Sequence, residues 1–211
     1  MAYLILGLIV SYLLGSIPTA YLFGRAKGID IRQHGSGNVG ATNALRVLGK
    51  AAGITVLFLD VLKGFLAVIV LGDILIKLTP VVPAETARII LGIACICGHN
   101  WTVFLKFKGG KGVATTFGVL IGLAFKVFNL PIVLGLVILI WFLTFFFSRI
   151  VSLSSVAASI ALPVFTVFFK LSLTIIIASL VLSVFSLFRH KGNLVRLFQG
   201  KEPRLSFKKV K

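Results

Sequence analysis

Acidic residues are scarce in this 211-residue chain, which has five Asp and Glu against 22 Lys and Arg and a formal net charge of +17. Charged residues make up only 13% of the chain, whereas soluble domains carry about 25%. Apolar residues make up 58%, and the mean hydropathy is +1.10. This composition excludes a soluble domain, a disordered chain and a coiled coil. We therefore expect an integral membrane protein whose positive charge suits lipid head groups or anionic substrates rather than nucleic acid.

Cysteine is also scarce, and Cys95 and Cys97 lie in an apolar run, two residues apart. This spacing on a helix excludes a disulfide framework and a zinc site. No Gly-x-Ser-x-Gly elbow is present, and no Asp follows His34, His99 or His190 at the spacing of a His-x4-Asp pair. The sequence thus lacks the residues for covalent serine catalysis, for acyl transfer from CoA by a His–Asp pair and for metal hydrolysis. We expect no metal and no cofactor.

Long apolar runs dominate what is present. Seven are long enough to suggest membrane spans, which need about 20 mostly apolar residues. They cover residues 2–23, 51–76, 86–105, 112–128, 130–147, 151–169 and 171–188. The last four are crowded, so five or six spans is the competing count. We expect the first run to be retained, because no basic segment precedes it and no good cleavage site follows. The expected fold is an all-α integral membrane bundle of about seven helices, forming a single domain over 1–211.

The Lys and Arg residues predict an orientation for this bundle. With seven spans, 17 of the 22 fall on one side, in the segments 24–50 and 106–111, the turn at Arg149 and the C-terminal tail. Four fall on the other side, and Lys63 lies inside the second run. By the positive-inside rule the N-terminus lies outside and the tail lies in the cytoplasm. We therefore expect a multi-pass membrane protein whose polar, glycine-rich segments face the cytoplasm.

The first cluster of polar and small residues lies between the first two runs. Gly35, Gly37 and Gly40 match the spacing of a dinucleotide fingerprint, but 27 residues between two spans cannot hold the strand–helix–strand unit that this fingerprint requires. The glycines and helix start can still form a nest for an anion. Ser36, Asn38, Thr42 and Asn43 add hydrogen-bond donors, and Arg46 adds a fork suited to phosphate. An ordinary glycine-rich turn with capping residues explains this cluster equally well.

The second cluster precedes the fourth run and reads Lys-Phe-Lys-Gly-Gly-Lys-Gly over residues 106–112. It is not a Walker A loop, because Leu105 occupies the place of its first glycine and Gly112 the place of its Ser or Thr. Glycines, cations and the positive end of a helix together favour phosphate. A flank of cations under the positive-inside rule would account for the lysines but not for the three glycines.

The remaining polar residues fall in the tail and inside the apolar runs. His190 and Asn193, three residues apart, could share a helix face, although a basic tail on anionic lipid is the plain alternative. Asp60 and Lys63 are predicted to neutralise each other inside the membrane, and His99 to hold helices together. The serines that begin the sixth run, Ser152, Ser154 and Ser155, could cap a helix or bind an anion. Together the clusters predict one phosphate-rich site at the cytoplasmic face.

Four segments, in order along the chain, closely resemble the bacterial acyl-phosphate:glycerol-3-phosphate acyltransferases, the PlsY family. They are residues 35–43, 60–64, 98–99 with 108–115, and 189–203. The resemblance covers nearly the whole chain, with Val39 and Thr102 standing where many members have proline. It implies transfer of a fatty acyl group from acyl phosphate to the 1-hydroxyl of glycerol 3-phosphate, giving lysophosphatidic acid and inorganic phosphate. An acyl phosphate has a good leaving group, so the protein needs to supply only positioning and charge stabilisation. The alternatives are an anion transporter or a lipid-binding protein.

With this reaction in view, we predict that Ser36 and Arg46 hold a phosphate and stabilise charge at the acyl centre. His190 and Asn193 orient glycerol 3-phosphate, and either His190 or the substrate's own phosphate acts as the general base. Further substrate contacts are predicted at Gly37, Asn38, Gly40, Thr42, Asn43, Lys108, Gly109, Gly110, Lys111, Gly112, Thr115, Ser154 and Ser155. Asp60, Lys63, His99 and Glu202 are predicted as structural support. We expect a monomer in the lipid bilayer.

Overall fold

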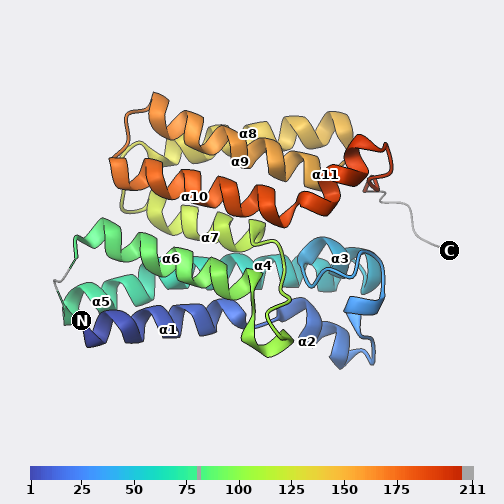
Figure 1. The fold of residues 1–211 in the computed structure, drawn as a ribbon, viewed down its shortest axis with the longest axis horizontal. Coiled ribbons are helices and arrows are strands. Elements are labelled where there is room, and N and C mark those ends of the chain that lie inside the picture. Colours follow the sequence, from blue (N-terminus) through green and yellow to red (C-terminus); the bar gives the residue numbers. More distant parts are fainter. Residues whose placement is uncertain (80–81, 206–211) are drawn as a thin grey trace. The chain divides into compact units, whose positions relative to one another are not determined.

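The computed structural model describes residues 1–79 and 82–205, and within these ranges every regular element is a helix (Figure 1). The predicted all-α fold is therefore confirmed. The chain divides into two compact units, the first covering Met1–Phe128 and the second beginning at Asn129. Lys208, Lys209 and Lys211, which were counted in the cytoplasmic tail, lie outside the described residues.

The first unit contains seven α-helices, two 3-10 turns and one π-helical segment within its described residues. In chain order they are α1 (Ala2–Ser16), α2 (Thr19–Ala26), η1 (Ile31–Gln33), α3 (Ala41–Val47), α4 (Lys50–Leu66), η2 (the π-helical Ala67–Leu71), α5 (Gly72–Leu78), α6 (Ala84–Asn100), η3 (Val103–Leu105) and α7 (Val113–Ala124). The second unit contains α8 (Leu130–Ser148), α9 (Val151–Phe168), α10 (Leu173–Arg189) and α11 (Lys191–Phe198). Within it, α9 packs against both α8 and α10.

All seven predicted apolar runs are helical, but they differ in length. In the described part of the chain, four helical segments are long and apolar enough to cross a membrane, and up to six are if each of two bent pairs counts as one span. The bent pairs are α1 with α2, at 40°, and α10 with α11, at 60°. The helix α7 is apolar but has only 12 residues. The count of seven spans and the orientation remain predictions.

The bend in the first run has a local cause. Pro18 has no N–H to donate and disfavours a helical conformation at the residue before it, so α1 ends at Ser16 and α2 begins at Thr19. Ile17, between them, has an extended ψ of 112°. The break leaves backbone carbonyl groups at the end of α1 without a helical partner, and two buried side chains described below donate to them.

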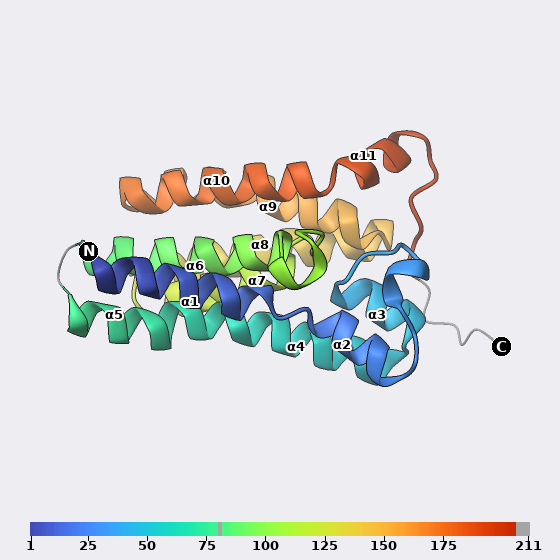
Figure 2. The same ribbon diagram turned by 60° about the horizontal axis from the view of Figure 1, so that its bottom comes forward.

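Glycines allow the helices of the first unit to pack closely around the candidate site. A Cβ on Gly98 of α6 would lie 2.0 Å from the Tyr12 carbonyl oxygen of α1, and a Cβ on Gly64 of α4 would lie 2.2 Å from the Thr115 carbonyl oxygen of α7. Such contacts exclude any larger residue, as in membrane helices that associate through small residues. Both pairs of helices lie side by side (Figures 1 and 2). This packing fixes the end of α6 and the start of α7 against their neighbours.

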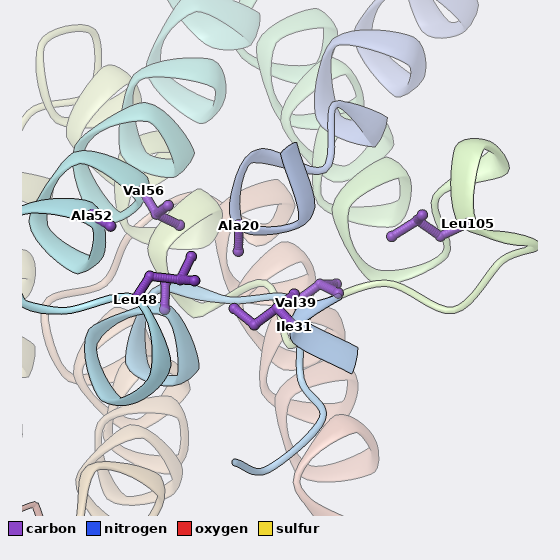
Figure 3. Packing of buried hydrophobic residues seen from close by; sticks show 8 residues of the cluster. Ala20, Ile31, Val39, Leu48, Ala52, Val56 and Leu105 are labelled. Carbon is purple, nitrogen blue, oxygen red and sulfur yellow. The ribbon is translucent and has the colours of Figure 1, made fainter. Parts of the chain in front are cut away.

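The segment 24–50, predicted as a loop, is partly helical. Its short helix α3 begins after extended Gly40 and is followed by Gly49, which has a φ of +95°. Ala44 and Leu48 are buried against Ala20, Ile31, Val39, Ala52, Val56 and Leu105, the cluster shown in Figure 3. Burial of one apolar face therefore folds α3 onto α2 and α4, and the first polar cluster lies on an ordered support.

Candidate active site

Asn43 organises the first polar cluster. Its side chain is buried, accepts a hydrogen bond from the Ser36 amide at 2.9 Å, and donates to the carbonyl oxygens of His34 at 3.1 Å and Ile31 at 3.3 Å. A Cβ on Gly35, which has a φ of +61°, would lie 2.3 Å from the Asn43 Oδ1. Both amide hydrogens and the oxygen of Asn43 thus already shape the loop, so its predicted contact with a substrate would require an exchange of partners.

The other predicted residues of this cluster are more accessible. Ser36 and Arg46 are exposed, whereas Gly37, Asn38, Gly40 and Thr42 are half-buried. Gly37 has a φ of +70°, a conformation that favours glycine. The structure thus presents the predicted catalytic pair, Ser36 and Arg46, on the outside of a folded loop.

Two other cations of this loop have structural contacts. Arg32 forms a two-pronged pair with Asp30, at 2.9 and 2.6 Å, and lies over the ring of Tyr21. The hydrogen bond from Arg32 lowers the pKa of Asp30 to about 2. Lys27 donates to the Leu48 carbonyl oxygen at 2.9 Å. Arg32 and Lys27 therefore brace the loop.

The glycine loop, residues 106–112, is attached to the end of α6. The Gly110 amide donates to the His99 carbonyl oxygen at 2.9 Å, and the Gly109 amide donates to the Asn100 carbonyl oxygen at 3.2 Å. Because each amide already has a backbone acceptor, its predicted contact with phosphate would require an exchange of partners. Both positions require glycine because a side chain would clash with His99. A Cβ on Gly109 would lie 2.1 Å from the His99 carbonyl oxygen, and a Cβ on Gly110 would lie 2.1 Å from the His99 Nε2.

The remaining residues of the second cluster differ in exposure. Lys108 is exposed and Lys111 is half-buried, so both ammonium groups belong to the surface layer of the loop. Gly112 is buried, has a φ of +79° and immediately precedes α7. Thr115, in the first turn of α7, is completely buried. The two lysines and the start of α7 therefore remain candidates for binding an anion.

A buried ion cluster lies beneath the glycine loop. Asp60 and Lys63 pair at 2.8 Å, which confirms the predicted partnership. The Thr19 hydroxyl also donates to Asp60 Oδ1 at 2.8 Å, and His99 Nδ1 lies 3.6 Å from the same oxygen. Lys63 donates further to the Ile17 carbonyl oxygen at 3.2 Å. The cluster thus joins α4, the α1–α2 break and α6. Sequence reasoning missed Thr19, whose only signal is its place after the helix-breaking Pro18.

A small pocket brings the first and second polar clusters together. Its lining includes Val39 from the first cluster, Gly110 from the glycine loop, and His99. The α1–α2 break contributes Gly15, Ser16, Ile17, Pro18 and Thr19, and Thr102 completes the lining. No group of three or more His, Cys, Asp or Glu side chains within 1–79 and 82–205 is placed to hold a metal ion.

Thr102 closes the α1–α2 break with a hydrogen bond. Its buried hydroxyl donates to the Ser16 carbonyl oxygen at 2.6 Å and accepts from the Phe104 amide at 3.3 Å. A proline, expected here from the family resemblance, has no hydroxyl to do this. Thr102 thus links the segment after α6 to the end of α1 by a hydrogen bond that a proline could not form.

We expect Thr102→Val to lower the free energy of unfolding by about 1–3 kcal/mol, because the Ser16 carbonyl would be buried without its donor. Thermal unfolding in detergent would measure the loss. The control is Thr55→Val, which removes an exposed hydroxyl that donates only to Ala51 of its own helix. Equal melting temperatures for the two variants would contradict a tethering role.

In the second unit, Glu202 organises the third polar cluster. Its Oε1 accepts from Ser152 Oγ at 2.7 Å and from Asn193 Nδ2 at 2.5 Å, and its Oε2 accepts from Arg196 Nε at 2.8 Å. Burial would raise the pKa of Glu202, but these hydrogen bonds and the Arg196 charge outweigh it and hold the pKa below the ordinary 4.5. Asn193 is buried in α11 by this contact. Glu202 thus supports Asn193, as predicted for a structural residue.

His190 lies at the bend between α10 and α11, where it follows the last residue of one helix and precedes the first of the other. Its side chain is 2% exposed, and its Nδ1 lies 2.8 Å from the Ser186 carbonyl oxygen. Because a carbonyl only accepts, Nδ1 carries the hydrogen in this contact. The neutral ring then has its lone pair on Nε2, which is the arrangement that a general base requires.

The serines of α9 form hydrogen bonds within their own unit. The Ser154 hydroxyl donates to the Ile150 carbonyl oxygen and the Ser155 hydroxyl to the Val151 carbonyl oxygen, each at 2.9 Å. Ser155 Oγ also accepts from the Trp141 indole at 3.3 Å. Both hydroxyls are therefore satisfied by the protein, and their predicted contact with substrate would require an exchange of partners.

The Glu202 contacts predict a pH dependence of stability. Because the pKa of Glu202 is lower in the folded chain, its ionised form stabilises the fold above about pH 4.5, and this contribution is lost as the pH falls below that value. We expect the melting temperature of the wild-type protein to fall more steeply between about pH 6 and pH 3.5 than that of Glu202→Gln. Parallel slopes would show that the carboxylate does not stabilise the fold.

Comparison with known proteins places the chain in a family. The glycerol-3-phosphate acyltransferase family model matches residues 5–200. A glycerol-3-phosphate acyltransferase of Prochlorococcus marinus (strain NATL2A) is 45% identical, and the match covers 94% of this chain and 96% of that relative. Another, of Staphylococcus carnosus (strain TM300), is 39% identical, and the match covers 97% of this chain and 98% of that relative. The crystal structure of PlsY, an integral membrane glycerol 3-phosphate acyltransferase, in its glycerol 3-phosphate form has a TM-score of 0.84 and 36% identity, covering 96% of each chain.

The lysophosphatidic acid form of PlsY has a TM-score of 0.81, again with 36% identity, and covers 96% of this chain and 95% of that one. Since the family model, the relatives and the solved structures each span nearly the whole chain, this protein belongs to the glycerol-3-phosphate acyltransferase family.

Proposed function

We propose that this membrane enzyme, a glycerol-3-phosphate acyltransferase, takes its acyl group from an acyl phosphate and releases lysophosphatidic acid and inorganic phosphate. The observation that carries the proposal is the family match over residues 5–200. The acceptor and the product are the two molecules named for the similar PlsY structures. The acyl phosphate donor is supported by the family resemblance and by the sequence's lack of a serine elbow and a His-x4-Asp pair. These matches favour an acyltransferase over an anion transporter.

In the proposed reaction, the 1-hydroxyl oxygen of glycerol 3-phosphate attacks the acyl carbonyl carbon. A new ester bond forms, the bond between the acyl carbon and the phosphate oxygen breaks, and phosphate leaves with its electron pair. Arg46 and Ser36 bind phosphate and stabilise the charge that develops at the carbonyl oxygen. Lys108, Lys111 and the N-terminus of α7 attract a second phosphate. No acyl-enzyme forms, since the mixed anhydride is itself activated.

The hydroxyl proton passes to a base, for which His190 is the protein's candidate and the substrate's phosphate is the alternative. The Nδ1 contact with Ser186 favours a ring able to accept a proton at Nε2. We expect His190→Ala to lower kcat at saturating substrate by about 10²- to 10⁴-fold if the ring is the base. A raised KM with kcat within a few-fold of the wild type would assign the proton to the phosphate instead.

We further propose that the active site faces the cytoplasm of a bacterial inner membrane and that the enzyme works as a monomer with a single functional domain. The asymmetry of Lys and Arg supports the orientation. Both substrates are anions, so the cationic side is the side that attracts them. We propose no role for nucleic acid.

The donor proposal is tested by comparing palmitoyl phosphate with palmitoyl-CoA. Purified protein in detergent or liposomes would receive glycerol 3-phosphate with each donor in turn, and lysophosphatidic acid would be measured by mass spectrometry. We expect product only with palmitoyl phosphate. Equal rates with palmitoyl-CoA would contradict the proposed donor while leaving the acyltransferase activity intact.

A further inference from the structure

Several buried polar atoms in the described part of the first unit lack a hydrogen-bond partner, and three of the four belong to Asn100 and Thr115. Within residues 1–79 and 82–205, four side-chain nitrogen or oxygen atoms are buried without a hydrogen-bond partner: Asp60 Oδ2, Asn100 Oδ1, Asn100 Nδ2 and Thr115 Oγ1. They belong to α4, the end of α6 and the start of α7. A buried polar atom without a partner is costly, so native proteins usually satisfy it with a ligand, a water or another residue.

Asn100 is directed toward the N-terminus of α7. Its side chain is 1% exposed, and its Oδ1 lies 2.6 Å from where a Cβ would stand on Gly112, the residue immediately before the helix. In the described chain, no side chain caps this helix end. Thr115, one turn further on, is 0% exposed. The α7 N-terminus therefore has a buried amide beside it and a buried hydroxyl in its first turn.

The chemistry of these atoms indicates the kind of group they would bind. Asn100 offers both a donor and an acceptor, and the Thr115 hydroxyl offers both as well. A fully deprotonated phosphate accepts hydrogen bonds but cannot donate to Asn100 Oδ1, whereas a hydroxyl group can do both. Binding a hydroxyl would thus satisfy atoms that a phosphate alone would leave unpaired.

We infer that Asn100 and Thr115 form a hydroxyl-binding subsite at the start of α7, next to the proposed phosphate-binding loop. The hydroxyl belongs either to the glycerol moiety of the acceptor or to an ordered water. In the first case Asn100 is a specificity-determining residue that recognises the 2-hydroxyl, which takes no part in the reaction. This inference rests on the proposed function for the identity of the acceptor.

The test uses 3-hydroxypropyl phosphate, which keeps the reacting hydroxyl and the phosphate but lacks the 2-hydroxyl. The ratio of kcat/KM for glycerol 3-phosphate to that for the analogue would be measured for the wild type, Asn100→Leu and Thr115→Val. If the acceptor hydroxyl binds here, the wild type should prefer glycerol 3-phosphate by about tenfold or more, and the variants should bring this ratio close to one.

Melting temperatures without substrate separate the two sources of the hydroxyl. If an ordered water occupies the subsite, Asn100→Leu and Thr115→Val should unfold at lower temperature while the kinetic ratio stays unchanged. A ratio and a melting temperature that are both unchanged, or a melting temperature that rises while the ratio stays unchanged, would overturn the inference, because filling a site that binds nothing with apolar groups removes a penalty. Valine is nearly equal in shape to threonine, so Thr115→Val still tests the subsite if Asn100→Leu fails to fold.

Thr166→Val is the matched control, since Thr166 is also fully buried but its hydroxyl donates to the Pro163 carbonyl oxygen and contacts Ser179. This variant should lose stability without any change in the kinetic ratio. If the wild-type protein acylates neither acceptor from palmitoyl phosphate, the proposed function fails. If it acylates both, and Asn100→Leu and Thr115→Val leave the kinetic ratio and the melting temperature unchanged, only the subsite fails.

Discussion

Replacing Arg46 with alanine is expected to lower kcat/KM by about 10²- to 10³-fold, the effect of losing one stabilising donor from a transition state with developing charge. Arg46 is exposed on α3, so the substitution should leave the fold and the melting temperature nearly unchanged. Arg46→Lys should recover only part of the activity, because an ammonium group cannot form the two parallel hydrogen bonds of a guanidinium. Steady-state kinetics with palmitoyl phosphate and glycerol 3-phosphate would measure both.

Lys50→Ala is the control for Arg46, since Lys50 is exposed four residues later and carries the same charge. If general attraction of anions were the main effect, both variants would lose activity alike and added salt would abolish the difference between each variant and the wild type. Near-normal activity in Arg46→Ala would remove Arg46 from the proposed mechanism.

Gly109→Ala is expected to reduce activity by about 100-fold or more and to lower the melting temperature. The added Cβ would lie 2.1 Å from the His99 carbonyl oxygen, which also accepts the Gly110 hydrogen bond. Because both atoms at this contact belong to tightly held backbone, the loop must move away from α6. A shift of about 1 Å in groups that position a substrate is enough for such a loss. Activity and thermal unfolding would be measured on the same sample.

The control for Gly109 is Gly135→Ala in α8, where an added Cβ has no atom within 4 Å in the described structure. Alanine is favoured over glycine inside a helix, so this variant should keep its activity and be equally stable or slightly more stable. A Gly109→Ala enzyme with normal kinetics would show that the hydrogen bonds between the loop and α6 do not position the substrate.

Features that depend on composition and short-range spacing could be predicted from the sequence. The seven apolar runs are helical, although only four to six helical segments in the described chain are long and apolar enough to cross a membrane. Asp60 pairs with Lys63 because residues three apart share a helix face. Ser36, in the loop, and Arg46, on α3, are both exposed, and their contact with substrate stays a prediction. These inferences required no knowledge of which helices pack together.

Features that depend on long-range contacts could not be predicted. Nothing in the local sequence shows that Asn43 bonds to the backbone around His34, or that the amides of Gly109 and Gly110 find acceptors at the end of α6. A glycine-rich segment looks the same whether its amides bind phosphate or the protein's own carbonyl groups. Only the packing of α6 and the glycine loop shows that the amides of Gly109 and Gly110 already have backbone acceptors.

The most direct test of the account is phosphate release from palmitoyl phosphate by the purified protein, with and without glycerol 3-phosphate, in the absence of CoA and added metal. The account predicts release only when glycerol 3-phosphate is present, with one lysophosphatidic acid formed for each phosphate and no burst of phosphate beforehand. Equal release without the acceptor, or a burst equal to the enzyme concentration, would contradict direct transfer between the two bound substrates.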